Sequence, residues 1–202
     1  MSLPDFSHEA ALGGRVAGVD EVGRGPLAGP VVAACVYFPD PAQIPSGISD
    51  SKILRSATRQ RLCAEIKAVA YVGIGQCSVE EIDSINILQA SLRAMHRAVE
   101  AMGQAVDHIL VDGNRLPKWP WAATALVKGD TRSLSIAAAS IIAKEYRDGL
   151  MRALDVAFPH YGWARNMGYG TAEHLAALAR AGATVHHRKS FAPVKKIICE
   201  KI

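Results

Sequence analysis

The sequence lacks the features that would assign it at once to a membrane, disulfide-rich or zinc-binding class. Its four cysteines include no C-x-x-C pair, which argues against a zinc knuckle and gives no disulfide framework. The longest nearly continuous apolar run, over residues 136–143, is too short to span a bilayer. Residues 1–15 contain acids and no apolar stretch long enough for a signal peptide. We therefore expect a reduced, soluble, cytoplasmic protein without a membrane segment.

A strong excess of one charge is also missing, because the formal net charge is only +4 over 202 residues. Half of the residues are apolar and 21% are charged, which excludes a disordered chain and suits one domain with a sizeable core. The positive excess is concentrated in residues 186–202, which hold five Lys or Arg against Glu200. Such a basic end suits a phosphate backbone, although a solvated, lysine-rich terminus explains it equally simply.

The pattern of apolar residues predicts a mixed sheet with helices on its faces, in one domain over residues 1–202. Strands are expected over residues 16–20, 30–38, 71–77, 108–111 and 122–127. Helices are expected over residues 57–70, 78–102, 134–154 and 171–182, the last taken as the final helix of the chain. Ser78 and Glu81 form a capping box at the start of the second helix. About residues 1–14 are expected to be a flexible lead.

Carboxylates follow three of these strands, and each position lies within two residues of a glycine. They are the pair Asp20 and Glu21, then Asp112, then Asp130. A single Asp after a strand is most often a turn former that hydrogen-bonds its own backbone, and that interpretation stays open for each position. Because strands of one sheet end on common edges, the same four carboxylates could instead converge on one site.

Convergence would restrict the chemistry of that site. Four uncompensated carboxylates repel one another and take up protons, and a divalent cation removes this penalty. An all-oxygen ligand set without nearby Cys or His selects Mg²⁺ or Mn²⁺ over Zn²⁺. Two such ions about 4 Å apart can activate a water and stabilise the leaving oxygen of a phosphodiester. The four acids therefore favour phosphoryl transfer on a polyanion.

Two other functions compete with this interpretation. A Mg²⁺-dependent phosphatase with a nucleophilic Asp would need an Asp-x-Asp pair, which residues 20–22 do not supply. A non-catalytic nucleic-acid-binding module would be favoured only if the acids proved to be dispersed. Nucleotide-binding motifs give no support to other classes, since residues 23–29 depart from the dinucleotide fingerprint and no P-loop is present.

Eight blocks of the sequence, running in order from residue 18 to residue 194, resemble the ribonuclease HII family. They are residues 18–30 (GVDEVGRGPLAGP), 50–52 (DSK), 111–114 (VDGN), 128–130 (KGD), 135–140 (SIAAAS), 158–162 (FPHYG), 168–171 (GYGT) and 187–194 (HRKSFAPV). The first block alone is highly specific, and the set covers most of the chain.

The resemblance implies an α/β, ribonuclease H-like fold with a mixed five-stranded sheet, flanking helices and a helical C-terminal extension. The extension, about residues 156–202, would bind substrate. The implied activity is metal-dependent cleavage of the RNA strand in RNA–DNA hybrids and at single ribonucleotides embedded in duplex DNA. The cut would fall on the 5′ side of the ribonucleotide and leave 3′-hydroxyl and 5′-phosphate ends, as ribonucleotide removal during DNA repair or replication requires.

The resemblance also assigns roles to individual residues. Asp20, Glu21, Asp112 and Asp130 would be the catalytic acids and would bind Mn²⁺ or Mg²⁺, as two ions when substrate is present. The substrate-binding residues would be Gly23, Arg24 and Gly25, which read the ribonucleotide, Tyr169, which stacks on the sugar, and Lys52 and Arg188, near phosphate. Only the 2′-hydroxyl separates RNA from DNA at such a site, and two glycines allow backbone groups to approach it.

The chain departs from the family pattern at two places. Ile53 stands where the family usually has a second lysine, and Asn166 and Met167 stand where it usually has His-Lys. Both changes remove basic character near the expected substrate, so they bear on phosphate affinity and leave the acids intact. A ribonuclease HIII would carry an extra N-terminal substrate-binding domain, and only about fifteen residues precede the first expected strand. We expect a monomer.

Overall fold

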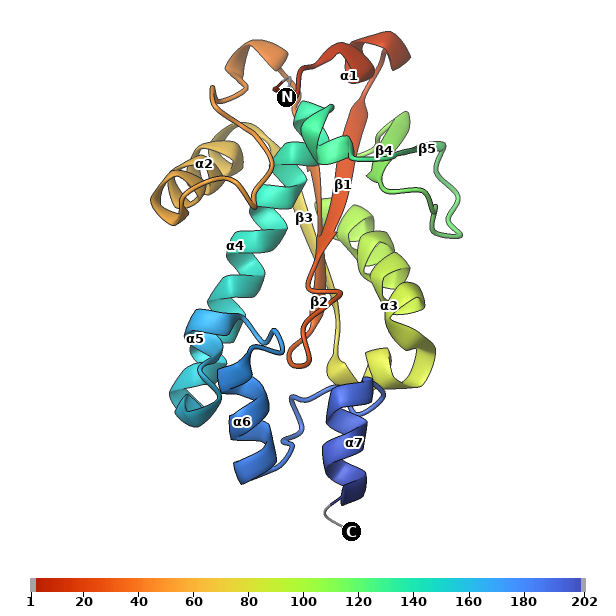
Figure 1. The fold of residues 1–202 in the computed structure, drawn as a ribbon. Coiled ribbons are helices and arrows are strands. Elements are labelled where there is room, and N and C mark those ends of the chain that lie inside the picture. Colours follow the sequence, from red (N-terminus) through yellow and green to blue (C-terminus); the bar gives the residue numbers. More distant parts are fainter. Residues whose placement is uncertain (1–2, 201–202) are drawn as a thin grey trace.

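The computed structural model describes residues 3–200 and contains one mixed five-stranded sheet (Figure 1). The strands are β1 (Val16–Val22), β2 (Val31–Tyr37), β3 (Tyr71–Cys77), β4 (His108–Asp112) and β5 (Ala123–Leu126). Their order across the sheet is β3-β2-β1-β4-β5, with β1, β2 and β3 antiparallel and β1, β4 and β5 parallel. This is the mixed, five-stranded α/β architecture that the sequence predicts.

Helices cover both faces of the sheet, and Figure 1 shows α3 on one side and α2 with α4 on the other. The helices are α1 (Ser7–Leu12), α2 (Ser56–Val69), α3 (Val79–Met102), α4 (Leu134–Ala157), α5 (Trp163–Asn166), α6 (Ala172–Ala181) and α7 (Ala192–Glu200). None of the helices in the described part is long and apolar enough to cross a membrane.

The strand β2 explains why the sheet needs two covering layers. Val31, Ala33 and Cys35 point into the core shared with α3, while the alternating Val32 and Ala34 face α2 and α4. Successive strand side chains point to opposite faces, so a strand that is apolar at every position must be covered on both. A third cluster joins α5, α6 and α7 to Leu27 and Ala28, which anchors the C-terminal part to the β1–β2 connection.

Three sequence predictions need correction. The strand expected over residues 16–20 continues to Val22, so Asp20 and Glu21 lie inside β1 and not after it. The helix that begins at Ala172 is not the last, because α7 follows it. Residues 3–14 do not form a loose lead: α1 holds a buried Glu9, whose Oε1 accepts hydrogen bonds from Ser133 Oγ (2.6 Å) and Ser135 N (2.9 Å) at the start of α4.

Candidate active site

The sheet brings three of the four acids to neighbouring strands and the fourth to an adjoining turn. The strands β1 and β4 are parallel, and Val19 lies opposite Val111. The next residue of each strand, Asp20 in β1 and Asp112 in β4, therefore lies beside the other. Asp112 Oδ1 accepts a hydrogen bond from Gly129 N (2.7 Å), which ties the end of β4 to the short 3₁₀ turn Gly129–Thr131. That turn carries Asp130, so the four predicted acids converge.

Electrostatics within this cluster oppose full ionisation. Burial raises the pKa of Asp20 well above its usual value, and the charges of Glu21, Asp112 and Asp130 raise it further. Burial also raises the pKa of Glu21, although Arg24 beside it works in the opposite direction. The pKa of Asp130 is raised by burial and by Asp112. The protein alone therefore does not compensate these carboxylates.

Two cations stand against the acids. Arg24 Nη1 lies 3.1 Å from Glu21 Oε1, and Lys52 Nζ lies 3.7 Å from Asp130 Oδ2. Both cationic side chains are more than half exposed, so solvent screens their attraction to the acids. Arg24 and Lys52, both predicted to contact substrate, lie at the rim of the acid cluster.

The donor set fits a divalent cation. Glu21 Oε2 is buried and has no hydrogen-bond partner, which is costly unless another group satisfies it. Across residues 3–200, no three His, Cys, Asp or Glu side chains stand at the spacing of a preformed metal site. The oxygens of Asp20, Glu21, Asp112 and Asp130 form the hard, anionic ligand set that Mg²⁺ or Mn²⁺ prefers.

Two cavities open on the acids and share Asp112 as a wall. One has a volume of about 300 Å³ and includes Glu21, Arg24 and Arg115 in its lining. The other has a volume of about 550 Å³ and includes Lys52, Lys128 and Asp130. Basic side chains thus flank the acids on both sides, as an extended polyanion would require.

The residues predicted to read the sugar form a loop next to an exposed tyrosine. Gly23 has φ +91°, and a Cβ built on it would lie 2.2 Å from Arg147 Nε, so only glycine fits there. A Cβ on Gly25 would lie 3.4 Å from the Tyr169 ring, which places the two side by side. Tyr169 as a whole is 48% exposed.

Arg188 corrects one of the substrate predictions. Its side chain is completely buried, and its guanidinium donates to the carbonyls of Gly23 (2.6 Å), Arg24 (2.9 Å) and Gly29 (3.0 and 2.8 Å). A group enclosed in this way does not reach a phosphate. Arg188 instead supports the loop that carries Arg24 from behind.

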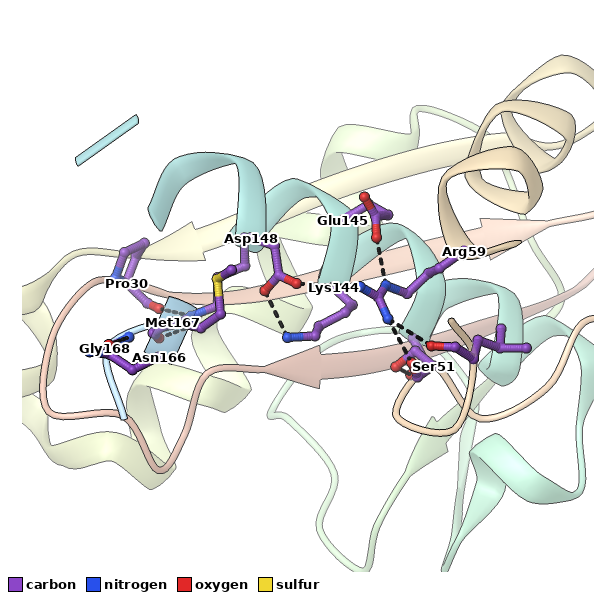
Figure 2. Close-up of polar contacts among 12 residues, drawn as sticks. Pro30, Ser51, Arg59, Lys144, Glu145, Asp148, Asn166, Met167 and Gly168 are labelled. Atoms are coloured by element: carbon purple, nitrogen blue, oxygen red, sulfur yellow. Dashed lines mark hydrogen bonds and ion pairs between the residues drawn. The ribbon is translucent and has the colours of Figure 1, made fainter. Parts of the chain in front are cut away.

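Sequence reasoning missed a second arginine with a similar role. Arg147 of α4 is also buried and donates to the carbonyls of Ala28 (3.0 Å), Pro30 (2.9 Å) and Met167 (3.0 Å). Figure 2 shows the Pro30 and Met167 carbonyls meeting at this point beside α4. Arg147 therefore links the loop after β1 to the loop that leads to Tyr169. The sequence signal that could have identified this role is that Arg147 is a basic residue on the otherwise buried face of a helix.

A buried ionic cluster holds the loop of Lys52. Arg59 of α2 pairs with Glu145 and Asp148 of α4, and its guanidinium also donates to Ser51 O at 3.2 Å (Figure 2). Ser51 Oγ lies 2.7 Å from Ser140 Oγ of the same helix. Ser51 therefore holds the loop of residues 50–52 against α4, while the ammonium of the neighbouring Lys52 remains exposed.

The two departures from the family pattern have different environments. Ile53 is 72% exposed and lies next to Lys52. Met167 is half-buried, adopts a left-handed conformation with φ +49°, and packs against the cluster of α5, α6 and α7. Met167 is therefore a packing residue, whereas Ile53 is open to whatever binds the rim of the site.

Comparison with known proteins agrees with this arrangement. The family model described as ribonuclease HII matches residues 17–194. A ribonuclease HII of Rhodospirillum rubrum is 59% identical over 202 residues, covering 97% of this chain and 92% of the relative.

Solved structures show the same fold. The crystal structure of ribonuclease H2 from Pyrococcus horikoshii matches with a TM-score of 0.74 at 25% identity, covering 92% of this chain and 98% of that one. A ribonuclease HIII described as in complex with Mn²⁺ matches with a TM-score of 0.73 at 23% identity, covering 92% of this chain and 70% of that one. With the family model and the identity to the Rhodospirillum protein, this shows that the chain belongs to the ribonuclease HII family of RNase H endonucleases.

Proposed function

We propose that the protein is a divalent-metal-dependent endonuclease that cleaves RNA in RNA–DNA hybrids and at single ribonucleotides embedded in duplex DNA. The cut falls on the 5′ side of the ribonucleotide and leaves a 3′-hydroxyl and a 5′-phosphate, which suits ribonucleotide removal from DNA. The observation that carries the proposal is the convergence of four acids around an unpartnered Glu21 oxygen. That cluster lies in a basic groove beside the glycine loop and Tyr169.

The four acids would hold the ions, and the rest of the site would hold the nucleic acid. Bound Mg²⁺ or Mn²⁺, as two ions with substrate present, supplies an activated water and stabilises the charge on the departing 3′ oxygen. Asp20 and Asp112 supply carboxylates from the neighbouring strands β1 and β4, Glu21 its unpartnered oxygen, and Asp130 a carboxylate from the turn. Lys52 and Arg24 are free to turn from the acids towards phosphate, since both are exposed.

Recognition of the ribonucleotide would come from the loop and the tyrosine together. Backbone groups of Gly23 and Gly25 can approach a 2′-hydroxyl because no side chain stands between them and the ligand. Tyr169 offers a flat, exposed ring against a sugar and a hydroxyl that can bond to it. The C-terminal part, about residues 156–202, carries this tyrosine and the exposed Lys195, and we assign this part to substrate binding. We propose that the protein acts as a monomer.

Cleavage of a defined duplex tests the proposal. We expect the protein with Mg²⁺ or Mn²⁺ to cut a DNA duplex carrying one ribonucleotide at its 5′ side, and EDTA to stop the reaction. Asp20→Asn, Glu21→Gln, Asp112→Asn and Asp130→Asn should each lower turnover by at least about 100-fold, because each removes a metal ligand.

The exposed Glu100→Gln on α3 is the matched acid-to-amide control and should keep full activity. Near wild-type cleavage by any two of the four site variants would contradict a shared metal site.

A further inference from the structure

Two buried histidines form a hydrogen-bonded chain that ends under Tyr169. His187 Nε2 lies 3.1 Å from His174 Nε2, and Trp163 Nε1 lies 3.0 Å from the same atom. His174 Nδ1 lies 2.8 Å from the carbonyl oxygen of Tyr169. His174, His187 and Trp163 are fully buried, and none of them touches the acid cluster. Apolar side chains could fill this buried region equally well, so the hydrogen bonds of these polar side chains need a separate explanation.

The direction of each bond in this chain follows from its donors. Thr184 N donates to His187 Nδ1 at 3.0 Å, so a neutral His187 carries its proton on Nε2 and donates to His174. The indole N–H of Trp163 can only donate, so His174 Nε2 must be an acceptor, and its single lone pair is shared by the Trp163 and His187 donors. His174 must then carry its proton on Nδ1, and that proton is donated to the Tyr169 carbonyl.

The environment keeps both rings neutral. Burial lowers the pKa of His174, and burial with the neighbouring His174, His186 and His160 lowers the pKa of His187 to about 3. The backbone groups of Tyr169 and Gly168, and then Glu173, act on the pKa of His174 in the opposite direction, but burial outweighs them. The fixed tautomers therefore persist at neutral pH, where a doubly protonated ring would lack an acceptor nitrogen.

The hydrogen-bonded chain of histidines contacts the backbone segment that carries Tyr169, residues 166–171. Tyr169 N donates to Asn166 O at 2.8 Å, and its carbonyl accepts from Thr171 N and from His174, while the residue as a whole is 48% exposed. His187 lies in an isolated bridge opposite Ala28, next to the glycine loop. The histidine chain thus runs from the edge of one recognition loop to the backbone of the other.

We infer that His174 is a positioning residue that sets, through the Tyr169 carbonyl, how well the enzyme distinguishes a ribonucleotide from its deoxyribonucleotide neighbour. The inference rests on the proposed function, in which Tyr169 contacts the sugar at the junction. His187 and Trp163 act one step further away, because they determine which nitrogen of His174 carries the proton. An enzyme that cuts long hybrids needs this discrimination less, since every nucleotide of one strand is then a ribonucleotide.

Two substitutions of His174 separate positioning from simple support. The side-chain amide of Asn lies near the position of Nδ1, so His174→Asn can still donate to the Tyr169 carbonyl. Gln extends to the position of Nε2, so His174→Gln can still accept from Trp163 but loses the donor to Tyr169. We measure kcat/KM on a duplex with one ribonucleotide and on a uniform RNA–DNA hybrid, and take the ratio of the two.

His174→Gln is expected to lower this ratio about tenfold, which corresponds to about 1.4 kcal/mol of lost discrimination. His174→Asn should keep the ratio within about threefold of wild type. Both variants lose part of the buried network, so a purely structural role would lower their melting temperatures and leave both ratios alike. In a Tyr169→Ala background, His174→Gln should change the ratio no further, because the two residues act as one unit.

Each other outcome overturns the inference in a recognisable way. If Tyr169→Ala lowers the ratio and His174→Gln does not, the positioning role fails and the role of Tyr169 stands. If Tyr169→Ala itself leaves the ratio unchanged, the proposed sugar contact fails and takes the inference with it. If His174→Gln does not fold, two-bond proton–nitrogen correlation spectra of the wild type decide. A proton found on Nε2 of His174 overturns the inference, and one on Nδ1 supports it.

Discussion

Among single residues, Arg147 and Arg188 are unusual because both are buried charges that hydrogen-bond backbone carbonyls of one loop. Every nitrogen of their guanidinium groups that has a hydrogen bond donates to a backbone carbonyl. Burial lowers the pKa of Arg147 to about 10 and that of Arg188 to about 9, which still leaves both charged at neutral pH. Carbonyl dipoles replace water around each charge, so the loop around Gly23 is held by strong, charge-assisted bonds.

Position 53 offers a test of the lost basic character at the rim. Ile53→Lys adds a cation beside Lys52 on an exposed side chain, so it should tighten binding of a hybrid at low salt. If the new ammonium neutralises one phosphate, the slope of log K against log salt should steepen by about 0.9. Salt-titrated binding in the presence of Ca²⁺, which we expect to support binding without turnover, measures the slope.

Met167→Lys is the matched control, because the family lysine is missing there too. Met167 packs against the C-terminal cluster, so a lysine should lower the melting temperature and leave the salt slope unchanged. A steeper slope for Met167→Lys and an unchanged one for Ile53→Lys would reverse our assignment of the two positions.

At the scale of elements, the contact of β3 with α3 depends on the absence of two side chains. A Cβ on Gly75 would lie 2.2 Å from Ala94 O, and one on Gly73 would lie 2.0 Å from Ala98 O. Both atoms belong to the backbone of α3 and cannot move aside alone. The glycines that weaken the strand propensity of residues 71–77 are therefore what allows the helix to approach the sheet.

Gly75→Ala should lower the free energy of unfolding by about 2 kcal/mol or more, because the added methyl group separates α3 from β3. Gly149→Ala is the control within α4, where a Cβ would meet nothing within 4 Å. It should raise the free energy of unfolding by about 0.5–1 kcal/mol through helix propensity. Urea unfolding of both variants measures the two changes, and a neutral Gly75→Ala would show that the two elements can separate without cost.

For the molecule as a whole, the acid cluster lowers the stability of the protein without metal. The pKa of Asp20 is raised on folding by burial and by its acidic neighbours, so the folded state binds more protons than the unfolded chain at pH values above about 4. Stability from this group therefore falls as pH rises from about 4 through the folded pKa. A divalent cation would reverse the effect, because it binds the folded state alone.

Asp20→Asn should thus raise the melting temperature of the EDTA-treated protein at pH 7.5, and the gain should shrink towards pH 4. Subtracting wild type at each pH removes the contribution of the histidines. Asp107→Asn is the control of opposite sign: Arg15 lowers the pKa of Asp107 to about 2, so its loss should slightly lower the melting temperature at neutral pH. A lower melting temperature for Asp20→Asn at pH 7.5 would contradict the repulsion argument.

The sequence alone determined the five strands, the four longest helices and the acids. Short apolar runs marked the five strands, the Ser78–Glu81 capping box marked the start of α3, and the expected places of Asp20, Asp112 and Asp130 close to the ends of three strands implied a common edge. These features are local, because strand period, helix caps and turns depend on residues within a few positions of one another.

Only the tertiary structure decided which buried side chains hold the backbone around the site in place. Arg188 reads as a basic residue in a basic tail, yet it meets carbonyls some 159 to 165 positions earlier in the chain. Glu9 accepts hydrogen bonds at the start of α4 across more than a hundred residues, and the contact of His174 with His187 joins α6 to the segment that follows it. Backbone carbonyls and N–H groups are the same at almost every residue, so nothing in the order of side chains tells which of them a buried arginine, glutamate or histidine will reach.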